Sequence, residues 1–251
     1  MAALVGVSAF ATAMREQPIA LFPRDANVQH YEVPSGFFEQ VLGPQLKYSC
    51  CLYPAADTTL AQAEEFALAE TALHADLADG QEILELGCGW GSLTLWMAER
   101  FPAARITAVS NSAPQRVHIE RRAAERGLVN LQVITADMNN FAIAHRFDRA
   151  VSVEMFEHMS NWPRLLANVH DWLRRGGGCF CTSSVIRRRR IGSTTTTART
   201  GSRAWMTAPR RSTRCCARPT ARTGCCGAGA GGCSSWRLPA FSVMTTAGNG
   251  V

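Results

Sequence analysis

The sequence predicts an α/β fold with a doubly wound parallel sheet over residues 81–177. Short apolar segments that read as strands alternate there with longer amphipathic segments that read as helices, which is the pattern of a parallel sheet covered by helices. The glycine-rich segment ELGCGWG, residues 85–91, joins the first strand to the first helix, and polar residues follow the next three strands. In open parallel sheets ligands bind beyond the carboxyl ends of the strands, so we expect the site there.

The expected elements follow one another at regular spacing. Four strands are expected at residues 82–86, 105–109, 131–135 and 149–153. One helix is expected at residues 92–101. A second begins at Pro114, which suits a first helical turn, and stops at Gly127, and a third covers residues 161–175 before Gly176 and Gly177.

Residues 1–80 are expected to form a helical cap beside the sheet. Proline and glycine residues break residues 15–46 into short pieces, which is typical of a cap. Asp57 or Thr58 is expected to cap a long helix at residues 59–77, which has an apolar face. The uncharged residues 1–14 lack the basic region and cleavage pattern of a secretory signal, and we expect a disordered N-terminus there.

Charge divides the chain into two unlike parts. The formal net charge is +6, but residues 178–251 hold twelve arginines and no lysine, aspartate or glutamate, whereas residues 1–177 hold fourteen basic residues against twenty acidic ones. Cys50, Cys51 and Cys88, the three cysteines before residue 178, make no disulfide framework. A reducing, cytoplasmic environment is therefore expected, and no segment reaches the roughly 20 apolar residues of a membrane span.

The glycine turn points to a nucleotide-like ligand. Glycine lets backbone N–H groups approach a ligand closely, although the same spacing also suits a purely structural turn. Glu85 within the turn argues against a phosphate-binding loop and favours a ligand with positive charge or hydroxyl groups. S-adenosylmethionine, which carries an ammonium group and a ribose, fits this description.

Polar clusters stand at the ends of the other three strands. They are Ser110-Asn111-Ser112, Asp137-Met138 and the segment EMFEHM at residues 154–159. Each alone suits a solvated loop or a helix cap. Together with the glycine turn they occupy four successive strand ends, which indicates one binding cleft.

These motifs resemble those of the cyclopropane-fatty-acid-synthase-type methyltransferases. The resemblance rests on ELGCGWGSL, SNSxxQ, AD and EMFEHM, with QHYEVPSGFF and KYSCCLYP upstream, and covers about residues 29–177. It is nearest to the branch that includes coclaurine N-methyltransferase. It implies a Rossmann-like class I fold, with S-adenosyl-L-methionine as the cofactor.

The resemblance also assigns roles to individual residues. Glu157 and His158 match an acidic-histidine pair beside the transferred methyl group, and Cys50 matches a cysteine that cyclopropane-forming members use around a bicarbonate ion. The residues that it places at the cofactor are Tyr48, Ser49, Glu85, Gly87, Gly89, Ser110, Asn111, Gln115, Asp137 and Met138.

The function expected from this resemblance is methyl transfer from S-adenosylmethionine to a small amine. Positioning the reactants in line can lower the barrier by about 7–11 kcal/mol, and a protonated amine also needs a base, for which His158 is the candidate. The alternative for Glu157 and His158 is that they simply begin a helix. Two alternatives for the function stay open: methylation of a lipid alkene, and an inactive fragment that only binds cofactor.

After Gly177 the family pattern is expected to stop. Relatives continue there with a fifth strand, whereas this chain continues with an arginine- and cysteine-rich, low-complexity tail. We predict that residues 178–251 are a frameshifted and disordered segment, because they lack the apolar residues needed for burial. Low activity and marginal stability would follow.

Two other interpretations of this tail were open. Arginine clusters bind phosphates, which suggests an arm for nucleic acid or anionic membranes. Paired cysteines without CxxC spacing fit zinc poorly, so no metal site is expected. We expect no specific nucleic-acid partner, and non-specific binding to anionic surfaces is what the tail could add.

Overall fold

The computed structural model describes residues 2–23, 34–183, 211–215 and 243–244, and within them one sheet runs through the molecule. Its strand order is β3-β2-β1-β4-β5-β6-β7. The strands are β1 (Glu82–Leu86), β2 (Arg105–Ser110), β3 (Leu131–Thr135), β4 (Phe147–Val153), β5 (Leu173–Ser183), β6 (Arg211–Cys215) and β7 (Val243–Met244).

The first five strands are parallel, which confirms the predicted doubly wound sheet. β1 lies at the centre and pairs with β2 on one side and with β4 on the other. β6 is antiparallel to β5, and β7 is antiparallel to β6. The order of the parallel strands reverses between β1 and β4, and this reversal opens the crevice in which such sheets bind ligands.

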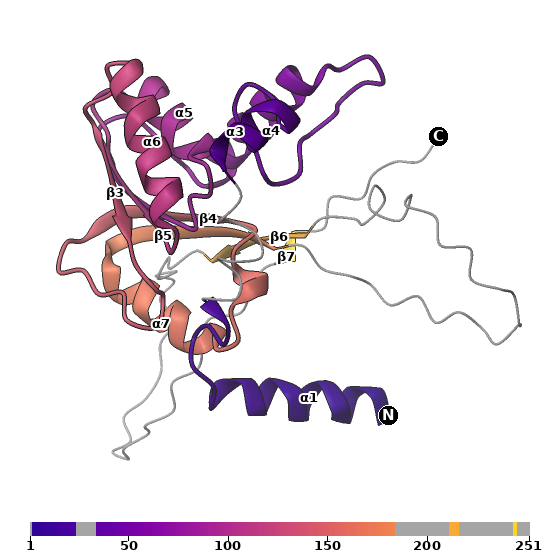
Figure 1. The fold of residues 1–251 in the computed structure, drawn as a ribbon. Helices are drawn as coiled ribbons and strands as arrows, with labels where there is room; N and C mark the ends of the chain where they lie inside the picture. The colour runs from indigo at the N-terminus through magenta and orange to yellow at the C-terminus, as the bar shows by residue number, and fades with distance from the viewer. Residues whose placement is uncertain (1, 24–33, 184–210, 216–242, 245–251) are drawn as a thin grey trace, which may run out of the picture.

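Helices cover both faces of the sheet (Figure 1). α4 (Leu60–His74), α5 (Ser92–Arg100) and α6 (Ala113–Glu125) lie on one face, and α7 (Trp162–Trp172) lies on the other. Ile83 and Ile106 pack with Met97 of α5, whereas Leu84 of the same central strand packs with Val169 of α7. All five residues of β1 are buried, because helices cover both faces of this strand.

The N-terminal region is more regular than the sequence suggests. α1 (Ala2–Arg15) is a helix, so the expected disorder of residues 1–14 is wrong for the residues described. Its alanine-rich sequence has high helix propensity, and Arg15 lies in the last turn, where a cation is favourable. The next described helix is α3 (Ser35–Val41).

α4 begins one residue later and ends three residues earlier than the expected helix at residues 59–77. Its cap is Thr59, not Asp57 or Thr58. The Thr59 backbone N–H donates to Gln62 Oε1 at 3.0 Å, and the Gln62 backbone N–H donates to Thr59 Oγ1 at 3.4 Å. This reciprocal capping box satisfies two backbone donors. It requires a cap residue three positions before Gln62, which is Thr59 and neither Asp57 nor Thr58.

The expected end of the regular sheet at Gly177 is also wrong. α7 ends at Trp172, and β5 continues to Ser183 beside β4. Cys179 and Cys181 are buried on the α7 face, and Phe180 is buried on the α4 and α5 face. A fifth parallel strand is therefore present, and its cysteines pack as small apolar side chains.

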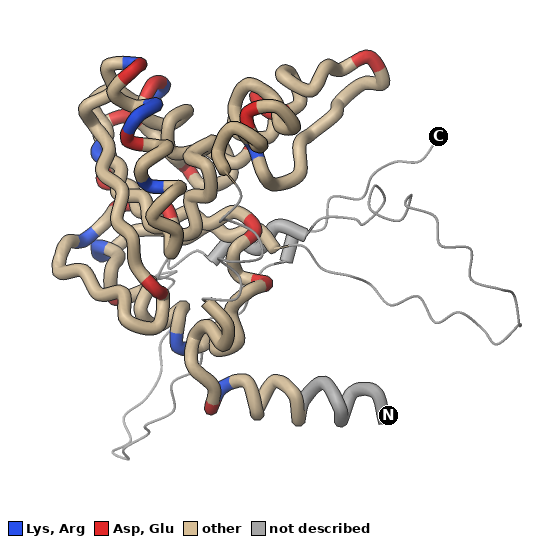
Figure 2. Tube along the Cα trace, viewed as in Figure 1, with Lys and Arg blue, Asp and Glu red and all other residues tan. Residues whose placement is uncertain are grey.

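Most of the predicted tail lies outside the described residues. The proposals of a frameshift, of disorder and of an anion-binding arm concern chiefly residues 184–210, 216–242 and 245–251. Outside the tail, basic and acidic residues lie side by side along α6 (Figure 2). Arg116 pairs with Glu120, and Arg121 pairs with Glu125, both at 2.7 Å.

None of the described helices combines the length and apolar character needed to cross a membrane.

Candidate functional site

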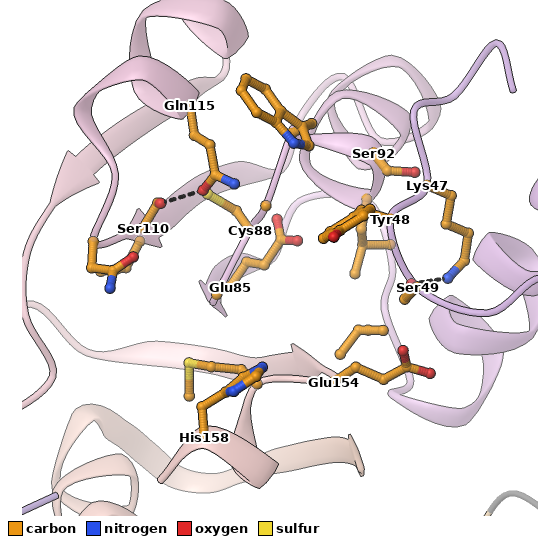
Figure 3. Close-up of a pocket in the computed structure, with 18 of the residues that line it drawn as sticks. Lys47, Tyr48, Ser49, Glu85, Cys88, Ser92, Ser110, Gln115, Glu154 and His158 are labelled. Atoms are coloured by element: carbon orange, nitrogen blue, oxygen red, sulfur yellow. Dashed lines mark hydrogen bonds between the residues drawn. The ribbon is translucent and has the colours of Figure 1, made fainter. Parts of the chain in front are cut away.

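A pocket opens at the carboxyl ends of β1, β2 and β4 (Figure 3). It brings together residues from six separate parts of the sequence, including the loop before α4 and the turn after β1. The predicted site residues that line it are Tyr48, Ser49, Glu85, Gly87, Gly89, Ser110, Asn111, Gln115, Met138 and His158. The pocket thus contains ten of the thirteen residues that the sequence analysis proposed.

The glycine turn forms the floor of the pocket. Gly87 has a φ of +78° and Gly89 a φ of +54°, a conformation that L-residues with a side chain rarely adopt. A Cβ at Gly87 would lie 2.8 Å from the Met155 side chain. A Cβ at Gly89 would meet no atom within 4 Å and would extend into open space beside the pocket. The two glycines therefore serve different purposes: Gly87 permits close packing with the β4 loop, and Gly89 keeps the floor clear.

Glu85 is a buried carboxyl group at the edge of this floor. It is 4 % exposed, and Thr94 Oγ1 donates a hydrogen bond to Glu85 Oε2 at 2.5 Å. Burial raises the pKa of Glu85 to about 8, and the Thr94 hydrogen bond offsets only part of that increase. Burial, with a smaller contribution from the nearby Glu85, also raises the pKa of the Cys88 thiol well above its ordinary value. Cys88 is therefore a poor nucleophile at neutral pH.

The turn after β2 orients Gln115. Ser110 Oγ donates to Gln115 Oε1 at 2.6 Å and accepts from the backbone N–H of Ser112 at 3.0 Å. Gln115 is 1 % exposed, and its Nε2 has no hydrogen-bond partner among the described residues. With its oxygen already engaged, Gln115 presents a donor amide at the pocket.

Four further buried polar groups lack a partner in the described part of the chain; His118 Nε2 and Arg122 Nε lie outside the pocket lining, and the other two lie at the pocket. The two at the pocket are Trp90 Nε1 and Ser92 Oγ, both in residues that line it. A buried donor without a partner costs about 1–3 kcal/mol. Three such groups around one pocket indicate a binding site for a polar ligand that would accept or donate these hydrogen bonds.

The end of β4 supplies the opposite wall. His158 and Glu154 face Glu85 and Tyr48 across the pocket (Figure 3). Glu154 has a φ of +52°, which is unfavourable for a residue with a Cβ and is typical of functional turns. Glu157 lies in the short 3-10 helix η1 (Phe156–His158), is exposed, and does not belong to the pocket lining.

Cys50 and Asp137 also lie outside the lining of this pocket. Cys50 is exposed in the loop that follows Ser49. Asp137 Oδ1 accepts the backbone N–H of Asn139 at 2.9 Å, so this carboxylate stabilises its own turn. The structure therefore brings together nine of the ten predicted cofactor residues and His158 in one pocket, whereas Glu157, Cys50 and Asp137 lie outside its lining.

Fourteen of the 24 lining residues were not proposed from the sequence as site residues, and four of these are Lys47, Trp90, Ser92 and Glu154. Trp90 and Ser92 belong to the glycine motif itself, and Glu154 opens EMFEHM, so the motifs could have indicated them. Lys47 precedes Tyr48, is only 7 % exposed, and its Nζ donates to Ser49 Oγ. A lone lysine beside an aromatic residue carries no comparable sequence signal.

An N-terminal segment, residues 15–23, crosses the loops at the same edge of the sheet. Asn139 binds Ala20 twice: its Oδ1 accepts the backbone N–H at 3.0 Å, and its Nδ2 donates to the carbonyl at 2.9 Å. Asn161 Nδ2 donates to two carbonyls of the segment at 2.7 and 2.9 Å, and Asn111 Nδ2 donates to a third at 3.3 Å. One asparagine after each of β2, β3 and β4 thus holds the segment by its backbone.

The chain matches a known protein family over most of its length. The model of the mycolic acid cyclopropane synthetase family matches residues 23–207. The chain belongs to that family. The family match begins upstream of the motifs at residues 29–177 and ends beyond them, and it includes all of β5.

Within the family, the chain is similar to a plant N-methyltransferase. It is 38 % identical over 167 residues to (S)-coclaurine N-methyltransferase of Thalictrum flavum subsp. glaucum, which is 66 % of this chain and 46 % of that protein. A solved structure of coclaurine N-methyltransferase bound to N-methylheliamine and SAH superposes with a TM-score of 0.70 at 35 % identity, covering 72 % of this chain and 52 % of that one.

A mycolic acid cyclopropane synthase is similar at lower sequence identity. The structure of a mycolic acid cyclopropane synthase complexed with SAH and CTAB has a TM-score of 0.58 at 27 % identity, covering 64 % of this chain and 57 % of that one. The predicted class I S-adenosylmethionine-dependent methyltransferase fold is thereby confirmed. The chain spans about half the length of the curated relatives that it matches.

Proposed function

We propose that this chain binds S-adenosyl-L-methionine in the pocket at the carboxyl ends of β1, β2 and β4 and transfers its methyl group to a small amine. The observation that carries the proposal is the set of unpartnered buried groups at the pocket, Gln115 Nε2, Trp90 Nε1 and Ser92 Oγ. A nucleoside with an amino-acid tail offers acceptors for such donors. The same cofactor is supported by the SAH found in both solved relatives.

The donors and carboxyl group on the glycine-turn side of the pocket would hold the cofactor. Ser110 and Gln115 present hydroxyl and amide groups, and Gly89 leaves room for the ligand against the backbone. Burial holds the pKa of Glu85 at about 8, so the neutral acid dominates at pH 7. A cationic group brought beside Glu85 would favour the ionised carboxylate, which would pair with it. When bound, the cofactor supplies an electrophilic methyl group on a sulfonium.

The opposite wall would receive the acceptor. Glu154 places a carboxylate at the pocket, where it would attract a cationic amine. His158 lines the same wall and would take the ammonium proton on an imidazole nitrogen, so that the amine lone pair is free to attack. Glu157, next to His158 on η1, would stabilise the imidazolium from the exposed side. Cys50, by contrast, would take part only in chemistry on a lipid alkene.

A methyl-transfer assay tests this proposal. The full 251-residue chain would be incubated with methyl-labelled S-adenosylmethionine and a panel of secondary and tertiary amines, with unsaturated phospholipid vesicles as the second acceptor class. Label in an amine, with at least a tenfold loss in His158→Ala, is the expected result. Label in the phospholipid would instead favour the alternative, methylation of a lipid alkene.

Cofactor binding without turnover is the second candidate function. The observation that favours it is that the unpartnered donors at the pocket belong to the glycine motif and to α6, which would hold the cofactor and not the acceptor. Saturable binding of S-adenosylhomocysteine without labelled product from any acceptor would identify this state. In either case we place the protein in the cytoplasm, on the basis of the few cysteines in its first 177 residues.

A further inference from the structure

The pocket wall at residues 46–49 is an irregular segment that cannot hold its own shape. It lies between α3 and α4 and has no regular secondary structure. Leu46 has a φ of +52°, a left-handed conformation that is unfavourable for a branched side chain. All four residues of the wall line the pocket. Contacts from outside the segment must therefore maintain it.

Apolar contacts supply part of this support, because Leu46 packs with Phe38 and Trp90 and the Tyr48 ring contacts Phe38. The backbone of the segment is held by a carboxylate on α4. Glu64 is 0 % exposed, and its two oxygens accept two backbone N–H groups of the segment: Oε2 from Gln45 at 2.9 Å and Oε1 from Lys47 at 3.1 Å. These donors stand on either side of Leu46. A single carboxylate thus accepts the backbone N–H groups of the residues before and after the left-handed Leu46.

The loop sequence provides the space for this carboxylate. A Cβ at Gly43 would lie only 2.4 Å from Glu64 Oε2, so no side chain fits at that position while the carboxylate stays in place. The carbonyl of Gly43 also accepts the backbone N–H of Leu46 at 2.9 Å, which closes the turn around the carboxylate. Beyond the wall, the backbone N–H of Leu52 donates to the carbonyl of Ala63 at 3.0 Å. The first turns of α4 therefore hold the wall at both ends.

The neighbouring glutamate has a different task. Both oxygens of Glu65 accept from Trp96 Nε1, at 2.8 and 2.9 Å, and Trp96 belongs to the core between α5 and the sheet. Neither Glu65 nor Trp96 lines the pocket. Two adjacent carboxylates of one helix thus face different parts of the molecule, which supplies a matched control.

We propose that Glu64 is a positioning residue for cofactor binding: its carboxylate sets the backbone of residues 46–49 so that Tyr48 and Ser49 meet the ligand. The proposal rests on the proposed function of the pocket. Glu64 itself lies outside the lining of the pocket and acts through the two peptide groups that it binds. The hydrogen bonds that the Glu64 carboxylate accepts come from the loop at residues 45–47 and not from the sheet, so its role is to hold the loop.

Calorimetric titration of the full chain with S-adenosylhomocysteine tests the proposal in Glu64→Gln. The amide of glutamine presents N–H donors where one oxygen stood, so one of the two loop amides loses its acceptor. We expect the dissociation constant to rise at least tenfold, about 1.4 kcal/mol, while Glu65→Gln stays within twofold of the wild type. Wild-type affinity in Glu64→Gln would overturn the proposal.

Amide hydrogen exchange separates positioning from general destabilisation. In Glu64→Gln the amide protons of Gln45 and Lys47 should exchange at least tenfold faster, with unchanged protection in the middle of α4. Equal loss of protection throughout α4 would show a merely structural role and would overturn the proposal. If the wild type binds no S-adenosylhomocysteine, the proposed function fails, and this exchange measurement still decides whether Glu64 holds the loop.

A second variant reaches the same contact from the opposite side. Gly43→Ala displaces the carboxylate without altering it, and Gly36→Ala, where a Cβ meets no atom within 4 Å, is its control. We expect Gly43→Ala to weaken S-adenosylhomocysteine binding and to add nothing further in the Glu64→Gln background, because both act on one contact. Additive losses in the double variant would contradict the proposal. Wild-type affinity in Gly43→Ala would contradict it even if Glu64→Gln failed to fold.

Discussion

Replacing Glu85 with glutamine should remove a strong pH dependence from the stability of this protein. Burial raises the pKa of Glu85 from 4.5 to about 8 in the folded chain. Because the folded pKa lies above the unfolded one, the stability it confers is fully present below about pH 4.5 and is lost as the pH rises through 8. The displacement corresponds to about 5 kcal/mol in total, of which about 2–3 kcal/mol is lost between pH 5 and pH 7.

Urea unfolding of wild type and Glu85→Gln at a series of pH values measures this effect. The variant keeps an oxygen for the Thr94 hydroxyl but cannot ionise, so the difference in unfolding free energy between the two proteins should change by about 2–3 kcal/mol from pH 5 to pH 7. Thr94→Val is the companion variant. The hydrogen bond from Thr94 lowers the Glu85 pKa, so its loss should raise that pKa and extend the loss of stability to higher pH. Parallel stability curves for wild type and Glu85→Gln would refute the reasoning.

The remaining predictions concern the turn, the N-terminal segment and the acid stability. Gly87→Ala should destabilise the chain by about 1–3 kcal/mol in urea unfolding, because of its positive φ and the 2.8 Å approach of Met155; an unchanged midpoint would contradict this. Asn139→Ala should cost about 1–3 kcal/mol and expose the backbone near Ala20 to limited proteolysis, whereas wild-type resistance would show that the segment is held otherwise. Burial alone would raise the pKa of Glu82, but hydrogen bonds from Arg105 and His145 lower it below its ordinary value. This carboxylate therefore stabilises the fold at pH values above its unfolded pKa, and that stabilisation is lost as the pH falls through its folded pKa. Arg105→Gln should therefore cost less than about 1 kcal/mol at pH 7 and nothing at pH 2, a difference that acid titration of the unfolding midpoint would detect or exclude.

The bounds of strands in the sheet could be predicted where two sequence signals coincide. A short apolar run before closely spaced glycines leaves little choice of boundary, and β1 and β3 occupy the predicted residues 82–86 and 131–135. β5 was missed because Arg174, Arg175 and three glycines precede its apolar part. Nothing local distinguishes such a strand from a tail. Its pairing with β4, a contact across the sheet, stabilises it.

The sequence motifs predicted which segments form the site, but not which side chains of each segment line the pocket. EMFEHM holds two carboxylates three residues apart, and the positive φ at Glu154 decides that this one, and not Glu157, lines the pocket. Glu64 left no signal at all, because the amphipathic pattern of α4 does not show which carboxylate turns inward to a loop backbone. Local sequence pattern identifies elements and motifs, whereas backbone strain and long-range hydrogen bonds depend on the assembled fold.

The central claim is that the pocket at the carboxyl ends of β1, β2 and β4 is a cofactor site. Calorimetric titration of the full 251-residue chain with S-adenosyl-L-methionine tests it most directly, with Gln115→Leu as the variant that removes the unpartnered amide. We predict saturable binding at one site per chain in the wild type and at least tenfold weaker binding in the variant. No heat of binding up to millimolar cofactor, or equal affinity in both proteins, would contradict the account.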